Sequence, residues 1–261
     1  MRNARFYGKG PFVVAVLHGG PGAPGEVAPV ARELSRDIGV IEPMQKADSI
    51  DGQVEELRSL LKKRARLPTG LIGHSWGAWL GFIFTARHPE FARKLVMIGS
   101  GPFEQRYAAR ISETRRSRMN KDERSEMASV LNRLEHPAAR ESEGLLRRLG
   151  ELSDKTDQFD PLPHDDEVIE FQGEVFMKVW REAEALRASG ELLELGKRVA
   201  CPVVAIHGDH DPHPAEGVEG PLSKVLRDFH FILLRRCGHA PWIERQAKEE
   251  FYRVLREIIL P

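Results

Sequence analysis

The sequence predicts an α/β fold in which a mostly parallel, doubly wound sheet is interrupted by a helical insertion. Between residues 12 and 98, short apolar runs alternate with segments of helical periodicity, the order expected of parallel strands with crossover helices. From about residue 102 to residue 199 charged helical stretches replace this alternation, and it then resumes. We therefore expect residues 1–101 and 200–261 to form the core and residues 102–199 to form a helical cap.

The first part of the core is expected to contain four strands and three helices. The strand-like runs are apolar and rich in β-branched residues, as in strands buried on both faces, and lie at residues 12–17, 39–41, 69–72 and 94–98. The helical segments lie at residues 26–37, 51–64 and 76–87. Asp51 is expected to cap the second helix, and the almost wholly apolar third helix is expected to be buried.

The remaining elements follow from the same patterns. Residues 167–190 are the longest amphipathic segment of the insertion and are expected to be helical. After them, apolar runs predict strands at residues 202–206 and 229–234, and helical spacing predicts helices near residues 222–227 and 247–259.

Charge and composition exclude several classes of function. Lys and Arg together number 39, and so do Asp and Glu, so no net field draws nucleic acid or an anionic membrane. No apolar run approaches the roughly 20 residues of a membrane span, and the N-terminus lacks an apolar signal region, so a cytoplasmic protein is expected. Two cysteines, Cys201 and Cys237, are too few for a disulfide scaffold and are expected at opposite edges of the sheet.

The central motif is Gly-His-Ser-Trp-Gly at residues 73–77, between a predicted strand and a predicted helix. This G-x-S-x-G spacing is typical of a nucleophile elbow, in which the serine lies at the tip of a strained turn. Side chains two residues before and after the serine would collide with neighbouring backbone, so glycine is needed at both positions. Ser75 is therefore the predicted nucleophile, and the backbone N–H of Trp76 is the predicted first donor of an oxyanion hole.

A serine hydroxyl needs a histidine to take its proton and a carboxylate to hold that histidine. Downstream of Ser75, one predicted strand ends in His-Gly-Asp-His-Asp and the next is followed by Cys-Gly-His, both at the carboxyl ends of parallel strands where such folds place their sites. We assign His239 as the base and Asp211 as its acid. Asp209 is the alternative acid, although we expect it to bond to the backbone of its own loop.

The second oxyanion donor is expected in the loop after the first strand, where residues 18–22 read His-Gly-Gly-Pro-Gly. Glycines allow backbone N–H groups to crowd onto a substrate oxygen. Gly20 is the first candidate and Gly19 the second. His18 is expected to hydrogen-bond within the loop.

Taken together, these motifs resemble those of the α/β-hydrolase superfamily, and the His-Gly-Gly-Pro-Gly loop with Gly-x-Ser-Trp-Gly is closest to the proline iminopeptidase group. The resemblance covers residues 1–101 and 200–261, and it implies the α/β-hydrolase fold with an inserted cap. Only 17 residues precede His18, so the N-terminal edge of the sheet is expected to be shortened. Residues 42–49 also differ from the Asp-Gln-Arg-Gly-type motif of the iminopeptidases, so the resemblance does not identify the substrate.

Three alternatives compete with this interpretation. Residues 20–25 match G-x-G-x-x-G, and Glu42 lies about 20 residues further on, as in a dinucleotide site, but two prolines remove N–H groups that a pyrophosphate would need. A dense set of possible metal ligands shares one loop, but side chains so closely spaced do not easily converge on one ion: His207, Asp209, His210, Asp211 and His213. A hydrolase-fold protein that only binds a small molecule is the third alternative.

The sequence thus predicts a serine hydrolase that cleaves an ester or amide bond of a small substrate through an acyl-enzyme. Ser75, His239 and Asp211 form the triad, the N–H groups of Gly20 and Trp76 form the oxyanion hole, and this chemistry needs no metal or organic cofactor. The expected partner is a small ester or a short peptide or amide, and the oligomeric state is left open. Carboxylesterase and proline iminopeptidase-like specificities both stay open.

Overall fold

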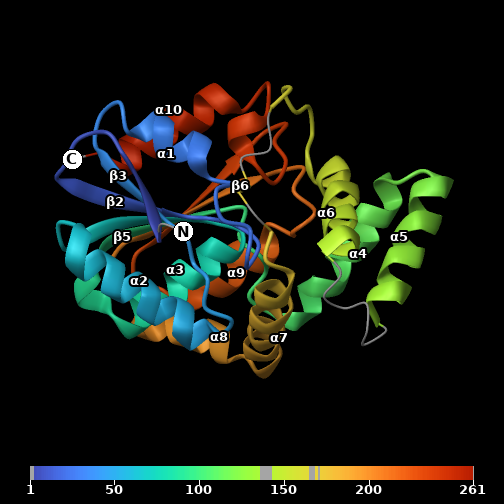
Figure 1. Ribbon diagram of the computed structural model, residues 1–261, viewed down its shortest axis with the longest axis horizontal. Coiled ribbons are helices and arrows are strands. Elements are labelled where there is room, and N and C mark those ends of the chain that lie inside the picture. The colour runs from blue at the N-terminus through green and yellow to red at the C-terminus, as the bar shows by residue number, and fades with distance from the viewer. Residues whose placement is uncertain (1–2, 136–142, 165–167, 170, 261) are drawn as a thin grey trace.

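The computed structural model describes residues 3–135, 143–164, 168–169 and 171–260 (Figure 1). Its centre is one sheet with the strand order β1-β3-β2-β4-β5-β6-β7. The strands are β1 (Ala4–Tyr7), β2 (Phe12–Leu17), β3 (Gly39–Pro43), β4 (Thr69–His74), β5 (Ala92–Ile98), β6 (Val203–Gly208) and β7 (Phe229–Leu234). All neighbouring strands pair in parallel except β1 and β3, so the prediction of a mostly parallel, doubly wound sheet is confirmed.

Helices cover both faces of the sheet, as Figure 1 shows. On one face α1 (Ala28–Leu34) and α10 (Lys248–Ile259) bury their apolar sides against β2, β4 and β5. On the other face α2 (Ile50–Arg64), α3 (Trp76–Arg87) and α9 (Glu216–Val225) enclose the larger part of the core. Helix α3 is buried along nearly its whole length, as its apolar sequence predicts, because it lies between the sheet and the outer helices.

Residues 102–199, here called the helical segment, contain helices and no strand within the part that the structure describes. These helices are α4 (Gln105–Arg118), α5 (Lys121–Glu135), α6 (Glu143–Asp157), α7 (Gly173–Ser189) and α8 (Glu191–Glu194). Helix α7 packs on the core through Val179 and Ala183, whereas α4, α5 and α6 extend to one side of the molecule (Figure 1). Between α5 and α6 lies a small separate cluster that includes Val130 and Leu146.

Three expectations about where helices start were wrong. Helix α9 begins at Glu216, six residues before the expected start near residue 222. Helix α2 is capped by Ser49, whose hydroxyl accepts the Gly52 N–H at 3.2 Å, and Asp51 lies two residues later, inside the first turn. Serine and aspartate are both good N-caps, so the sequence alone does not choose between them. Helix α7 begins at Gly173. Residue 167, where the helix was expected to start, lies outside the described residues, and Ile169 and Gln172 bond to the loop after β2 instead of continuing the helix.

The shortened N-terminal edge consists of one antiparallel strand, β1, which the sequence did not predict. It pairs with β3 and brings the Tyr7 hydroxyl to 2.6 Å from Glu42 Oε2, while Arg5 lies 3.6 Å from the same atom. Glu42 is fully buried. These contacts explain the acidic residue at the end of β3 without a bound ribose.

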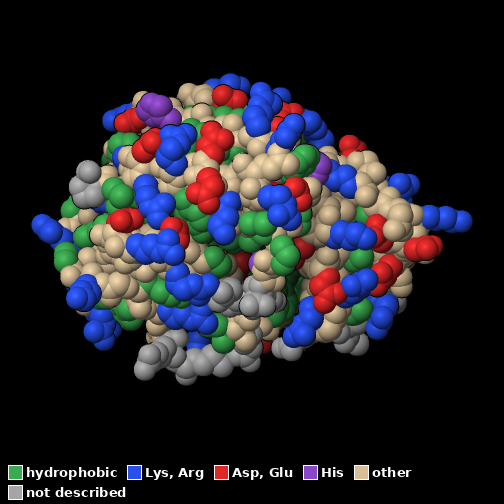
Figure 2. Space-filling view, turned by 90° about the horizontal axis from the view of Figure 1, so that it is seen from above, with side chains coloured by type: hydrophobic (Ala, Val, Ile, Leu, Met, Phe, Trp, Pro, Cys, Tyr) green, Lys and Arg blue, Asp and Glu red, His purple; other side chains and the backbone are tan. Residues whose placement is uncertain are grey.

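The surface agrees with the balanced composition. Basic and acidic side chains are both scattered over the face seen in Figure 2. None of the helices in the described parts of the chain combines the length and the apolar character that spanning a bilayer requires.

Candidate active site

Ser75 lies in the sharp turn between β4 and α3, with φ 51° and ψ −113°, a backbone conformation that non-glycine residues rarely adopt. Its N–H donates to the Ile98 carbonyl at 2.9 Å, which fixes the turn to β5. A Cβ atom at Gly73 would lie 2.1 Å from the Gly77 carbonyl oxygen, and one at Gly77 would lie 2.4 Å from the Leu17 carbonyl oxygen. The expected need for glycine at both positions is therefore confirmed.

The loop after β2 lies beside this turn. A Cβ atom placed on Gly19 would be 3.2 Å from Ser75 Cβ, so the loop backbone passes directly by the serine. His18 Nδ1 contacts the Gly19 carbonyl at 2.8 Å, as expected for a histidine that bonds within the loop. The Gly19 N–H donates to Glu26 Oε2 at 2.7 Å and is committed there. Gly20, at φ +44°, is the remaining candidate donor of the two.

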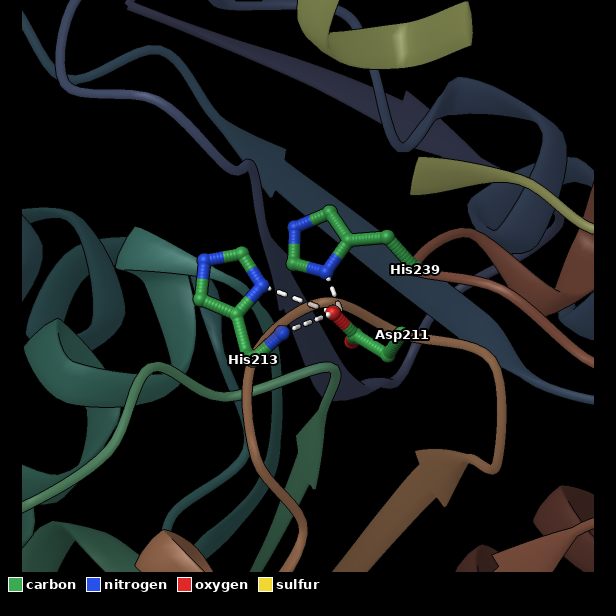
Figure 3. A group of neighbouring side chains, drawn as sticks. All are labelled: Asp211, His213 and His239. Carbon is green, nitrogen blue, oxygen red and sulfur yellow. Dashed lines mark hydrogen bonds and ion pairs between the residues drawn. The ribbon is translucent and has the colours of Figure 1, made fainter. Parts of the chain in front are cut away.

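The structure brings Asp211 and His239 together beyond the ends of β6 and β7. His239 Nδ1 lies 2.8 Å from Asp211 Oδ2, and the Asp211 side chain is fully buried (Figure 3). A second imidazole, that of His213, approaches the other oxygen: its Nδ1 and its backbone N–H lie 2.7 Å and 2.9 Å from Asp211 Oδ1. The rings of His213 and His239 stack with centroids 4.5 Å apart. His213 therefore fixes the orientation of Asp211 and supports one face of His239.

The charges of these three groups follow from their contacts. Burial opposes ionisation of Asp211, but the facing histidines His239, His213 and His207 outweigh it and hold its pKa well below the usual range. Burial also opposes the charged form of His239, but the Asp211 carboxylate outweighs it and raises its pKa to about 9. For His213 burial prevails and lowers the pKa to about 4. A neutral His213 thus donates to an ionised Asp211, which attracts a proton to His239.

His74, the residue before Ser75, connects the turn to His239. The ring of His74 lies with its centroid 4.7 Å from that of His239, and His74 Nε2 lies 3.1 Å from the His239 carbonyl oxygen. No hydrogen bond between Ser75 Oγ and His239 is present among the described residues. Nucleophile–base hydrogen bonds are often loose in the absence of substrate and tighten in the reacting complex.

Asp209 does not contact either histidine of Figure 3. Its Oδ1 accepts the Cys237 N–H at 3.3 Å, and Arg235 lies 3.7 Å from its other oxygen. The expected bond to its own loop is therefore wrong: Asp209 ties the end of β6 to the segment after β7. That contact leaves Asp211 as the acid that faces His239.

The five possible metal ligands of this loop do not converge. Only Asp211 and His213 gather, together with His239, and within the described ranges these three form the one group whose candidate ligand atoms lie within 4.8 Å of one another. His207 Nε2 donates instead to the His213 carbonyl at 2.7 Å, and His210 packs against Phe159. Both Nδ1 atoms lie within hydrogen-bond distance of the Asp211 carboxylate, at 2.7 and 2.8 Å, so each of its oxygens already has an imidazole partner.

The loop that carries His239 is held by the chain that follows α6. The His239 N–H donates to the Asp157 carbonyl at 2.9 Å, and the N–H groups before and after it are also bonded. The fully buried Glu244 accepts the N–H groups of Gly238, Phe159 and Asp160 at 2.7, 2.7 and 2.8 Å. Sequence reasoning missed this carboxylate because no motif marks it.

The loop after β2 is held by the chain that precedes α7. Gln172 N–H donates to the Gly22 carbonyl at 2.8 Å, and Ile169 N–H donates to the Pro24 carbonyl at 3.0 Å. A Cβ atom on Gly22 would lie 2.5 Å from the Gln172 carbonyl oxygen, so the two backbones are in close contact. Both loops that flank Ser75 therefore depend on the helical segment.

Aromatic side chains line the junction between the core and the helical segment. Trp180 stacks on Trp79 with centroids 6.0 Å apart, and Phe176 continues the stack. The Trp76 side chain donates to Gln53 inside the core, and Trp242 contacts the His74 ring edge-on at 4.6 Å.

Three acidic residues of the helical segment could receive a substrate's free amine: Glu167, Glu170 and Glu174. The first two lie outside the described residues. The third, Glu174, forms an ion pair with Lys178 at 2.6 Å. Its charge is therefore already compensated on the surface of α7.

Comparison with known proteins agrees with this geometry. A family model described as the alpha/beta hydrolase family matches residues 14–254. Among solved structures, VinJ is similar over 98% of this chain and 93% of its own, with 21% identity and a TM-score of 0.71. Proline iminopeptidase from Mycobacterium smegmatis is similar over 98% and 93%, with 18% identity and a TM-score of 0.65.

A third solved structure, the enol-lactonase from Burkholderia xenovorans LB400, is similar over 97% of this chain and 94% of its own, with 20% identity and a TM-score of 0.61. At these identities the likeness shows the fold alone. A search of curated proteins returned no match to the sequence.

Proposed function

The chain belongs to the alpha/beta hydrolase family, and from this premise we propose that it is a serine hydrolase with Ser75, His239 and Asp211 as its triad. The observation that carries the proposal is the 2.8 Å contact between His239 Nδ1 and the buried Asp211 carboxylate, beside a serine held at φ 51° in a strand-to-helix turn. A family whose members are generally hydrolases supports the same chemistry.

In the proposed reaction, Ser75 Oγ attacks the substrate carbonyl while His239 Nε2 takes its proton. The oxygen of the tetrahedral intermediate is held by the N–H groups of Gly20 and Trp76. His239 then gives the proton to the leaving alcohol or amine, which leaves an acyl group on Ser75. Water, deprotonated by His239, hydrolyses this ester and restores the free serine.

Asp211 contributes by fixing the tautomer and stabilising the imidazolium that forms. Its bond to Nδ1 leaves Nε2 as the nitrogen that faces the substrate, and its charge compensates the proton that His239 acquires. We also propose that residues 102–199 act as a cap, with the substrate held between the sheet and this segment. The backbone bonds to both loops beside Ser75 support that role.

An aminopeptidase specificity is the second candidate, favoured by acidic groups near the site. The Asp154 carboxyl at the end of α6 is close enough to Glu26 and His239 to feel their charges. Burial of its carboxyl group, and then the charge of Glu26, raise its pKa to about 6, although the residue as a whole remains exposed. A protonated amine next to the scissile bond would relieve this repulsion between carboxylates.

A fluorophosphonate probe tests the nucleophile, because it reacts with activated serines. We expect labelling at Ser75, located by mass spectrometry, and none in Ser75→Ala. Absence of labelling in the wild-type protein would favour the non-catalytic binding alternative. Short acyl esters compared with prolyl and alanyl anilides, with free and acetylated amino groups, then separate esterase from aminopeptidase.

A further inference from the structure

Glu26 is an acidic residue that contacts the loop of the proposed oxyanion hole, and the proposed reaction gives it no role. Its Oε2 accepts the Gly19 N–H at 2.7 Å, and its Oε1 lies 3.1 Å from His74 Nδ1. A Cβ atom on Gly19 would contact the Glu26 carboxylate, the His74 ring and Ser75 Cβ within 2.5 to 3.2 Å. The carboxylate thus lies where the loop after β2 meets the residues of the elbow.

His74 extends this contact to the catalytic histidine. Its Nε2 faces the His239 carbonyl at 3.1 Å, and because a carbonyl only accepts, Nε2 carries the hydrogen and donates. The ring is 1% exposed and is held edge-on by Trp242 at 4.6 Å. One rigid imidazole therefore contacts Glu26 through one nitrogen and the loop of His239 through the other.

The charge of Glu26 strengthens the contact with Gly19. Burial opposes its ionisation, but His74 and then His239 outweigh burial and lower its pKa to about 2. An ionised carboxylate therefore receives the Gly19 N–H, and hydrogen bonds to charged groups are shorter and stronger than neutral ones.

The position of Gly19 decides where the next N–H points. Gly20 follows with φ +44°, and its carbonyl accepts the Ala23 N–H at 3.0 Å, so the loop turns tightly just after the clamped residue. If Gly19 were released, the Gly20 N–H would no longer be fixed relative to Ser75. Oxyanion donors act only when they are preorganised within a few tenths of an ångström.

We propose that Glu26 is a positioning residue whose carboxylate joins the oxyanion loop to the loop of His239 through His74, and so aims the Gly20 N–H at the reacting oxygen. The role rests on the proposed serine hydrolase function. Glu26 itself does not contact the reacting atoms.

Two substitutions separate this role from a merely structural one. Glu26→Ala removes both contacts. Glu26→Gln keeps a carbonyl oxygen for the Gly19 N–H, and its amide can donate to a His74 Nδ1 that carries no hydrogen. Glu33→Ala is the matched control, since Glu33 is a similarly exposed acid on α1 that pairs with Arg36 and Arg256 away from the site.

The first readout does not depend on activity: it is the exchange rate of the Gly19 amide hydrogen, measured by NMR. We expect slow exchange in the wild-type protein and in Glu26→Gln, and exchange at least about tenfold faster in Glu26→Ala. The second readout is hydrolysis of p-nitrophenyl acetate. In Glu26→Ala, kcat should fall about 10- to 100-fold, while KM should stay within about twofold of the wild-type value. Glu26→Gln should recover most of the lost kcat. Glu33→Ala should have the kcat and KM of the wild-type protein.

The outcomes distinguish the two proposals. An active enzyme labelled at Ser75 whose kcat is unchanged in Glu26→Ala would overturn the positioning role alone. So would rapid exchange of the Gly19 amide in the wild-type protein, or a Glu26→Gln variant as slow as Glu26→Ala despite a protected Gly19. A wild-type protein that neither hydrolyses esters nor reacts with fluorophosphonate would overturn the serine hydrolase function, and the positioning role of Glu26 with it.

Discussion

The core and the helical segment are stabilised in different ways. In the core, strands β2, β4, β5 and β6 are buried on both faces, and α3 is enclosed along its length. In the helical segment, α4 buries none of its residues, and the cluster between α5 and α6 is small. Yet both loops beside Ser75 are bonded to this segment, one through residues 157–160 and the other through Ile169 and Gln172. The core holds the candidate reacting groups, and the helical segment is bonded to the two loops beside them, so we expect it to influence their alignment.

The largest effect expected is the loss of activity when the proposed nucleophile of the core is removed. Ser75→Ala keeps the Cβ atom and the strained backbone, so the fold should persist while kcat falls about a million-fold, because a triad acts as a unit. Hydrolysis of p-nitrophenyl acetate, with circular dichroism to check the fold, measures this. Full activity in the variant would show that the chemistry lies elsewhere.

The next effect distinguishes the two aspartates of one loop. Asp211→Asn should lower kcat about ten-thousand-fold, because the amide cannot hold His239 in the required tautomer. Asp209→Asn should change kcat little, since an amide oxygen can still accept the Cys237 N–H. The two variants are compared on one ester, and a larger loss in Asp209→Asn would reverse the assignment of the acid.

The pH dependence tests the electrostatics of the core. His239 must be neutral to take a proton, and Asp211 raises its pKa to about 9, so kcat/KM of the wild-type enzyme should rise with pH through that value. In Asp211→Asn the carboxylate is gone, the pKa of His239 should fall, and the rising limb should move to lower pH. The profile of kcat/KM against pH measures both, and an unshifted limb would contradict the pairing.

A smaller effect is expected where the helical segment meets the core. Glu244→Gln replaces one of two acceptor oxygens with a donor that faces a backbone N–H, so the free energy of unfolding should fall by about 1–3 kcal/mol. If this contact aligns His239, kcat should also fall about tenfold. Glu182→Gln, which affects only the contact of α7 with Ile50, should leave kcat unchanged. Urea denaturation and ester hydrolysis give the two values, and a loss of stability with normal kcat would mean that the segment supports the fold alone.

Much of the fold could be predicted because it depends on local pattern. Strands buried on both faces read as continuous apolar runs, so β2 and β4 begin where the sequence places them. Strand β1 was missed because its four residues alternate only weakly in burial and its partner is β3, far along the chain. Ser49 was missed as the cap because several residues near it have similar propensity.

The amino-acid sequence predicts the parallel part of the sheet, the glycines that the elbow requires and the order of the candidate serine, acid and histidine, because each follows from spacing along the chain. The folded chain shows which aspartate faces His239, that His213 shares it, and that Glu26 and Glu244 bond to the flanking loops. A buried carboxylate bonds to whichever N–H groups the fold brings near it. The elbow therefore shows in the sequence, and the groups that align it appear only once the chain is folded.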